Sequence, residues 1–148
     1  MRRVWSLVII LLLLGFAGAP ESPAGAPDVE FRIIVHPEVS GTHVPREDLS
    51  SIFLRDEMVW ADGQPVAPVD QSLRSAVRAA FSEHVLGEGM DTIEALWARK
   101  IIKGVTPPMV KTSDDEVISY VARTPGAIGY VSTDTRLPST VRILSILY

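Results

Sequence analysis

One short stretch of this sequence combines residue types that could bind an anion. Between Pro68 and Arg78 an apolar run gives way to two hydroxyl residues, Ser72 and Ser75, with Arg74 beside them. If a helix begins here, its first backbone N–H groups lack partners within the helix, and together with the helix dipole they favour a bound anion. A serine hydroxyl could donate to an oxyanion, and an arginine guanidinium could bind it through two parallel hydrogen bonds. Serine is also a preferred helix cap, so the pattern fits either a ligand site or ordinary capping.

Other residue patterns give little support for catalysis. The chain has no cysteine and no Gly-x-Ser-x-Gly segment, so neither a thiol nor a serine on a strand-to-helix elbow is available as nucleophile. His36 and His43 lie around an expected loop, and His84 lies late in an expected helix, so none is placed as a general base. We therefore expect a protein that is not an enzyme.

Metal binding is also unsupported. No two histidines are spaced i, i+4. The acidic run Asp114-Asp115-Glu116 begins an expected helix, where carboxylates interact favourably with the positive end of the helix dipole. The sequence therefore predicts neither a metal site nor a cofactor.

The charge distribution narrows the class of partner. The formal net charge is −4, and the 14 lysines and arginines are scattered among 18 acidic residues. An acidic chain without a basic patch argues against nucleic acid as a partner. Any anion must then be held by local geometry rather than by bulk charge.

The strands that would position the serine stretch can be read from apolar runs. Val29–His36 is rich in β-branched residues and apolar on both faces, which predicts a central strand. Three more strands are expected at 66–69, 127–131 and 141–147.

Four helices are expected between these strands. They span 47–54 after Pro45, 73–85 as the longest helix with Gly87 as its stop, 91–101 with Asp91 and Glu94 as a capping box, and 113–121 with Ser113 and Glu116 as another. Strands alternating with helices predict an α/β domain whose sheet is covered by helices and contains some parallel pairing.

The N-terminus has the three parts of a secretory signal. Arg2 and Arg3 precede an apolar run from Val4 to Phe16, and Ala17-Gly18-Ala19 supplies a small-residue cleavage site. The run is shorter than the roughly 17–25 residues of a spanning helix, although an uncleaved anchor stays open as the alternative. We expect a signal peptide at 1–19, with cleavage as late as 26, a flexible spacer at 20–28 and one domain at 29–148, located in the periplasm or outside the cell.

Several motifs occur in a fixed order along the chain. They are Ile52-Phe53-Leu54, Trp60-Ala61-Asp62-Gly63-Gln64-Pro65-Val66, Pro68-Val69-Asp70-Gln71, Ser75 with Phe81, Trp97, Gly104, Pro107-Pro108 and Pro125-Gly126-Ala127-Ile128-Gly129-Tyr130-Val131. With these motifs the region Val29–Val131 resembles the phosphate-binding components of ABC transporters, within the type II periplasmic solute-binding proteins, and more closely short exported domains of that kind. The resemblance implies one lobe of such a protein, with a mixed sheet covered by helices.

The resemblance also implies a location for the ligand. In the larger transport proteins the segment that begins at the Ser75 position reads Ser-Gly-Thr, and its hydroxyls and backbone N–H groups hold the oxyanion between two lobes. Here the segment reads Ser75-Ala76-Val77, so the glycine and the threonine hydroxyl are missing, and the chain has residues for about one lobe. The implied ligand-binding residues are Ser72, Ser75 and Arg78, with Arg74 as a further contact.

Two functions follow as expectations. The first is an exported protein that binds phosphate or a similar oxyanion, releases it without chemistry and serves an ABC permease. The second is a ligand-free interaction module, derived from one binding-protein lobe, that contacts an envelope protein or a second copy of itself. An oxyanion-dependent heat of binding would favour the first, and self-association insensitive to Ser75→Ala would favour the second.

Overall fold

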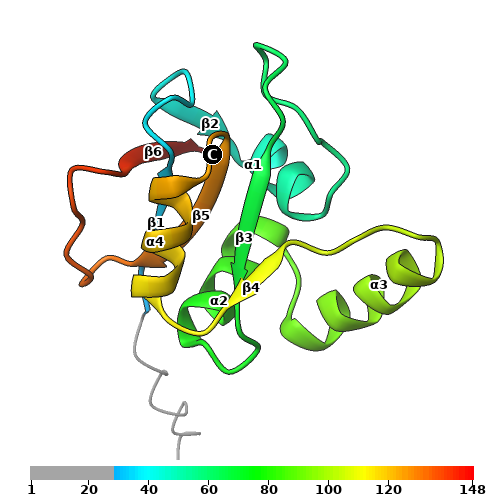
Figure 1. Cartoon of the computed structure of the whole chain (residues 1–148). Coiled ribbons are helices and arrows are strands. Elements are labelled where there is room, and N and C mark those ends of the chain that lie inside the picture. The colour runs from blue at the N-terminus through cyan, green and yellow to red at the C-terminus, as the bar shows by residue number, and fades with distance from the viewer. Residues whose placement is uncertain (1–28) are drawn as a thin grey trace, which may run out of the picture.

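The computed structural model describes residues 29–148, which form a six-stranded mixed sheet with helices on both faces (Figure 1). The strands lie in the order β2-β6-β1-β5-β3-β4. Their bounds are β1 Phe31–Val35, β2 His43–Pro45, β3 Ala67–Gln71, β4 Met109–Lys111, β5 Ala127–Ser132 and β6 Arg142–Leu147. The predicted α/β class is confirmed. The predicted signal peptide and spacer, residues 1–28, lie outside the described residues.

Strand β1 lies inside the sheet, as its two apolar faces predict. It pairs antiparallel with β5 on one side and with β6 on the other. Strand β3 runs parallel to β5 and β4, and β2 runs parallel to β6. Because β3, β4 and β5 are parallel, their carboxyl ends lie at the same edge of the sheet.

The two faces of the sheet carry separate helices. The helices are α1 Arg46–Phe53, α2 Ala76–Phe81, the π-helical turn η1 Ser82–Leu86, α3 Met90–Ile102 and α4 Asp114–Arg123. Successive strand residues face opposite sides, so Ile33 and Val35 pack with α1, α2 and η1, whereas Ile34 packs with α4. Helix α4 lies close to the sheet because Gly129 has no side chain. A Cβ there would lie 2.7 Å from a methyl of Val117.

The helix that carries Ser75 begins later than predicted. Leu73 fits the helical spacing, but its side chain is 54% exposed and lies in the turn before the helix. Ser75 is the N-cap, and α2 continues directly into η1. The helix ends at Gly87 as predicted, and this glycine has a φ of 74°. This helix is also not the longest, because α3 has 13 residues in one continuous α-helix.

The two predicted capping boxes have different outcomes. The capping box of Asp91 and Glu94 is wrong, because the N-cap of α3 is Gly89 and no side chain caps it. The box at Ser113 is confirmed in half: its hydroxyl accepts from the Glu116 amide, while the Glu116 carboxylate accepts from the Thr112 amide instead of the Ser113 amide.

Helix α3 extends away from the sheet (Figure 1). Ile93 and Trp97 are buried, but Ile101, which has the same helical spacing, and Ile102 are exposed. Within residues 29–148, no helix is long and apolar enough to cross a membrane.

Candidate functional site

The predicted helix start lies at the edge where three parallel strands end. Strand β3 ends at Gln71, shortly before the N-cap Ser75 of α2. Strand β4 ends at Lys111, shortly before the N-cap Ser113 of α4, and β5 ends nearby at Ser132. Ligands of open α/β sheets commonly bind outside the carboxyl ends of such strands. The fold therefore places the Ser75 region where a ligand site could form.

The hydroxyl of Ser75 makes two hydrogen bonds within the protein. It donates to Oε1 of Gln71 at 2.7 Å and accepts from the backbone N–H of Arg78 at 3.2 Å. The Ser72 hydroxyl accepts from the backbone N–H of Arg74 at 3.2 Å. Ser75 thus performs the capping role that the sequence left open beside ligand binding, whereas Ser72 stabilises the turn before the helix.

Arg78 points inward instead of toward the helix start. Its side chain is 7% exposed, and Nη1 donates to the carboxylate of Asp70 and, at 2.8 Å, to the backbone oxygen of Gln71. Its Nε is buried without a hydrogen-bond partner among the described residues. The positive charge of Arg78 is therefore paired with a carboxylate of the chain itself.

The Asp70 carboxylate has a second side-chain partner, which lies on a strand inside the sheet. The hydroxyl of Tyr130, on β5, donates to Oδ1 of Asp70, and the backbone N–H of Gln71 donates to the same oxygen at 2.8 Å. Burial, and then the neighbouring Asp70 charge, raises the pKa of Tyr130 well above its ordinary value near 10. Tyr130 is accordingly a neutral donor to the Asp70 carboxylate.

Asp114 accepts hydrogen bonds from three further donors at this edge. Its Oδ1 accepts from Nε2 of the buried Gln71 at 2.8 Å. Its Oδ2 accepts from the backbone N–H of Ser132 at 3.0 Å and from the hydroxyl of Thr135. A side-chain amide, a backbone N–H and a hydroxyl are donors that could hold an oxyanion, and here they hold the first carboxylate of α4.

We call this network the polar corner. Its members are Asp70, Gln71, Ser75, Arg78, Asp114 and Tyr130. The sequence reasoning found Ser75 and Arg78, and treated Asp114 only as a first-turn acid. It missed Asp70, Gln71 and Tyr130. One signal was present, because a tyrosine inside an apolar strand needs a partner for its hydroxyl.

Some groups at the start of α2 remain open. Among the described residues, the backbone N–H groups of Ala76 and Val77 have no acceptor, and the exposed Arg74 side chain makes no hydrogen bond. The Cβ atoms of Ala76 and Val77 limit how closely a ligand could approach the backbone there. No group of three His, Asp or Glu side chains in residues 29–148 could hold a metal ion.

Among the comparisons with known proteins, only that with solved structures finds matches. No protein-family model and no curated protein sequence matches the chain. Solved structures do match over 78% of this chain. An ABC-type phosphate transport receptor from Vibrio cholerae has a TM-score of 0.63 at 18% identity, and a putative phosphate ABC transporter substrate-binding protein with bound phosphate from Clostridium perfringens gives the same values. PstS from Borrelia burgdorferi has a TM-score of 0.62 at 20% identity.

The match extends over only part of those proteins. It covers 45%, 44% and 46% of the three chains, so this protein spans less than half of their length. The six-stranded mixed sheet with its helices therefore has the fold of one lobe of a periplasmic binding protein of the phosphate-transport type, as the resemblance implied.

Proposed function

We propose that this protein is an exported, non-enzymatic lobe of the binding-protein type that works by contacting another protein and does not hold a free oxyanion. The proposal rests on the hydrogen bonds within the polar corner. Asp70 and Asp114 already accept hydrogen bonds from Arg78, Tyr130 and Gln71.

A phosphate at the polar corner would meet two electrostatic obstacles. It would have to displace a carboxylate that the fold holds in place, and it would then lie beside that displaced negative charge. Two unit charges 4 Å apart repel by about 4 kcal/mol at an effective dielectric constant of 20. The single lobe adds to this cost, because small-ligand sites usually enclose most of the ligand surface.

The sheet offers a surface for protein contact at β4. This edge strand pairs with β3 alone, and the side chains of Met109 and Val110 are about half exposed. An edge strand with exposed apolar side chains tends to associate with another chain. A second copy of this protein is the simplest partner to test. The proposal that the protein is exported depends on the N-terminal signal pattern.

Sedimentation velocity tests the contact. We expect the average mass to rise between about 1 and 100 µM protein, because association depends on concentration. Val110→Lys should abolish the rise, and Ser75→Ala should leave it unchanged. Ile143→Lys is the matched control, because Ile143 is an equally exposed strand residue on β6. A mass that stays monomeric throughout, together with saturable phosphate binding, would refute the proposal.

Oxyanion binding is the second candidate function, as in a substrate-binding component that serves an ABC permease. It is favoured by the unpaired N–H groups of Ala76 and Val77, by the exposed Arg74, and by the phosphate named for the structural neighbours. Ser72, Ser75 and Arg78 would then complete the site after the polar corner rearranges.

Isothermal titration with phosphate tests this candidate. Binding would give saturable heat at or below about 1 mM phosphate. Arg74→Ala should then abolish the heat, whereas Arg99→Ala, another exposed arginine on α3, should retain it. The absence of heat at millimolar phosphate rejects the candidate.

A further inference from the structure

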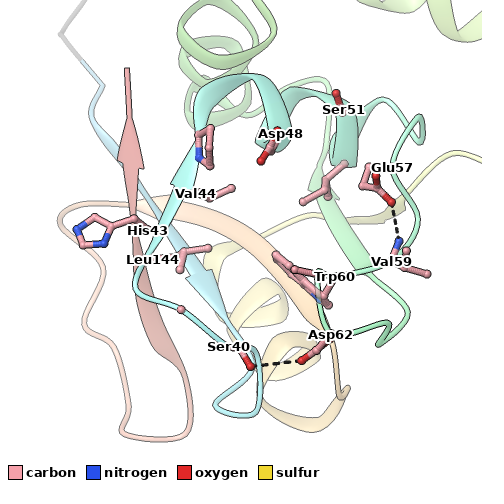
Figure 2. A pocket seen from close by; sticks show the side chains of 14 residues that line it. Ser40, His43, Val44, Asp48, Ser51, Glu57, Val59, Trp60, Asp62 and Leu144 are labelled. Carbon is pink, nitrogen blue, oxygen red and sulfur yellow. Dashed lines mark hydrogen bonds between the residues drawn. The ribbon is translucent and has the colours of Figure 1, made fainter.

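A separate cavity lies at the opposite edge of the sheet from the polar corner. Its volume is about 700 Å³, and it lies between the start of β2, helix α1 and the turn that contains Trp60 (Figure 2). This volume is within the range of small-molecule sites. The cavity shares no residue with the polar corner.

The floor of the cavity is apolar and fixed. Val44, Ile52 and Leu144 line it and are buried against the core of the α1 face. Trp60 forms part of the wall, and its position is set by two hydrogen bonds. Its Nε1 donates to the backbone oxygen of Gly126 at 2.9 Å, and its backbone N–H donates to that of Gln64 at 2.7 Å. An apolar ligand body would therefore meet a preformed surface.

The charged residues that line the cavity are all acidic. They are Asp48, Glu57 and Asp62, and no lysine or arginine is among the lining residues. Figure 2 shows the three carboxylates around Trp60, with Asp48 on helix α1 and the other two on the turn. A cavity with this charge repels anions and attracts cations.

Two of these carboxylates are positioned by the turn itself. Oε1 of Glu57 accepts from the backbone N–H groups of Met58 at 2.9 Å and Val59 at 3.1 Å. Asp62 accepts from the backbone N–H of Gln64 at 3.0 Å and from the hydroxyl of Ser40 at 3.3 Å. These are neutral donors, so the negative charges are oriented but not compensated.

Neighbouring cations are directed elsewhere. Arg142 donates to the backbone oxygens of Gly41 and Val39 and is not among the residues that line the cavity. Arg46 donates to the backbone oxygen of His84 and pairs with Glu47. Asp48 has no ion-pair partner among the described residues.

We propose that this cavity binds a small organic cation, an ammonium or guanidinium group on an apolar body. The apolar body lies on Val44, Ile52 and Leu144 beside Trp60, and the cationic group lies near the unpaired Asp48 carboxylate, in a cavity that Glu57 and Asp62 make more negative. Indole is also the preferred aromatic partner of a cation. This site is independent of the proposed protein contact, which lies at β4 on the other side of the sheet.

A nuclear magnetic resonance titration with three matched probes tests the site. The probes are 2-phenylethylamine, 2-phenylethanol and phenylacetate, which share the ring and differ in charge. We expect the amine to shift the Trp60 indole resonance and the amides of residues 57–62 saturably, with the alcohol weaker and the carboxylate without effect. Equal shifts with all three probes, or no shift with the amine at about 10 mM, would overturn the proposal.

Two variants locate the charge that is responsible. Asp48→Asn should weaken amine binding by roughly two- to five-fold, the range of one exposed ion pair. Asp91→Asn is the matched control, since it removes an exposed aspartate from the first turn of α3. The same loss of affinity in both variants would show a general charge effect and would exclude the site. A defect in self-association alone would leave these shifts intact.

Discussion

The polar corner and the cavity lie at different places on the sheet and treat their polar groups in opposite ways. At the polar corner, Arg78 is paired with Asp70, and Asp114 is held by Gln71 and the end of β5. At the cavity, Asp48 is exposed and unpaired among the described residues, and Glu57 is held only by neutral donors. The corner has the residue types expected of an anion site, but most of its donors, Nε of Arg78 excepted, already have acceptors within the protein. The comparison teaches that suitable residues at a suitable place in a fold form a ligand site only if their hydrogen-bonding capacity is left free.

The largest effect is expected from breaking the ion pair of the polar corner. Asp70→Ala leaves the Arg78 charge buried without a partner, and such a change costs about 3–5 kcal/mol. Urea denaturation measures the loss in unfolding free energy. Asp56→Ala is the control, because it removes the 59% exposed partner of Lys100 and should cost about 1 kcal/mol or less. Equal losses would show that the corner is not a compensated buried network.

Removing the Tyr130 hydroxyl is expected to have the next largest effect. Tyr130→Phe leaves an oxygen of Asp70 short of a donor, at a cost of about 1–3 kcal/mol near neutral pH. Because the folded protein raises the pKa of Tyr130, the unfolded chain ionises first as the pH passes about 10, and the wild-type protein then loses stability. The stability difference between wild type and variant should therefore shrink between about pH 9 and 11. A constant difference would contradict the raised pKa of Tyr130.

A smaller effect is expected at the N-cap of α2. Ser75→Ala should cost about 1–2 kcal/mol, because it removes the cap and also leaves Oε1 of the buried Gln71 without its donor. Ser113→Ala removes only a cap from α4 and should cost about 1 kcal/mol or less. Thermal unfolding of both variants checks the order. A larger loss at Ser113 would mean that Ser75 is not part of a network.

The smallest effect on stability is expected at the cavity. Asp48→Asn changes an exposed side chain in the first turn of α1, so the unfolding free energy should fall by about 0.5 kcal/mol, through the helix dipole alone. Urea denaturation checks this. A loss comparable to that of Asp70→Ala would mean that the cavity carboxylates are structural, like those of the corner.

The sequence predicted those parts of the fold that local patterns determine. The apolar faces of β1 and the cap at Ser113 were sufficient to place a central strand and helix α4. Strands β2 and β4 were missed because three residues are too few for an alternating pattern. The start of α2 was misplaced because Leu73 fits helical spacing, although the Ser75 cap fixes the helix start beyond it.

The candidate site was harder to predict because its contacts join distant segments. The helix start and Ser75 follow from local spacing. The partners that fill the corner do not, because Tyr130 is 60 residues from Asp70 and Asp114 is 43 residues from Gln71. Those distances in sequence become contacts only through the parallel pairing of β3 with β5 and the placement of α4.

Tyr130 joins the two kinds of interaction in a single side chain. Its ring stacks on Phe81 with centroids 4.0 Å apart and lies 5.6 Å from that of Phe53, while its hydroxyl reaches the Asp70 carboxylate. The aromatic core and the polar network cannot loosen separately. In native-state hydrogen exchange, amides of β3 and β5 should exchange only through cooperative global unfolding. Helix α3 has few contacts with the rest of the domain. Its amides should therefore exchange first, through local unfolding of this helix alone.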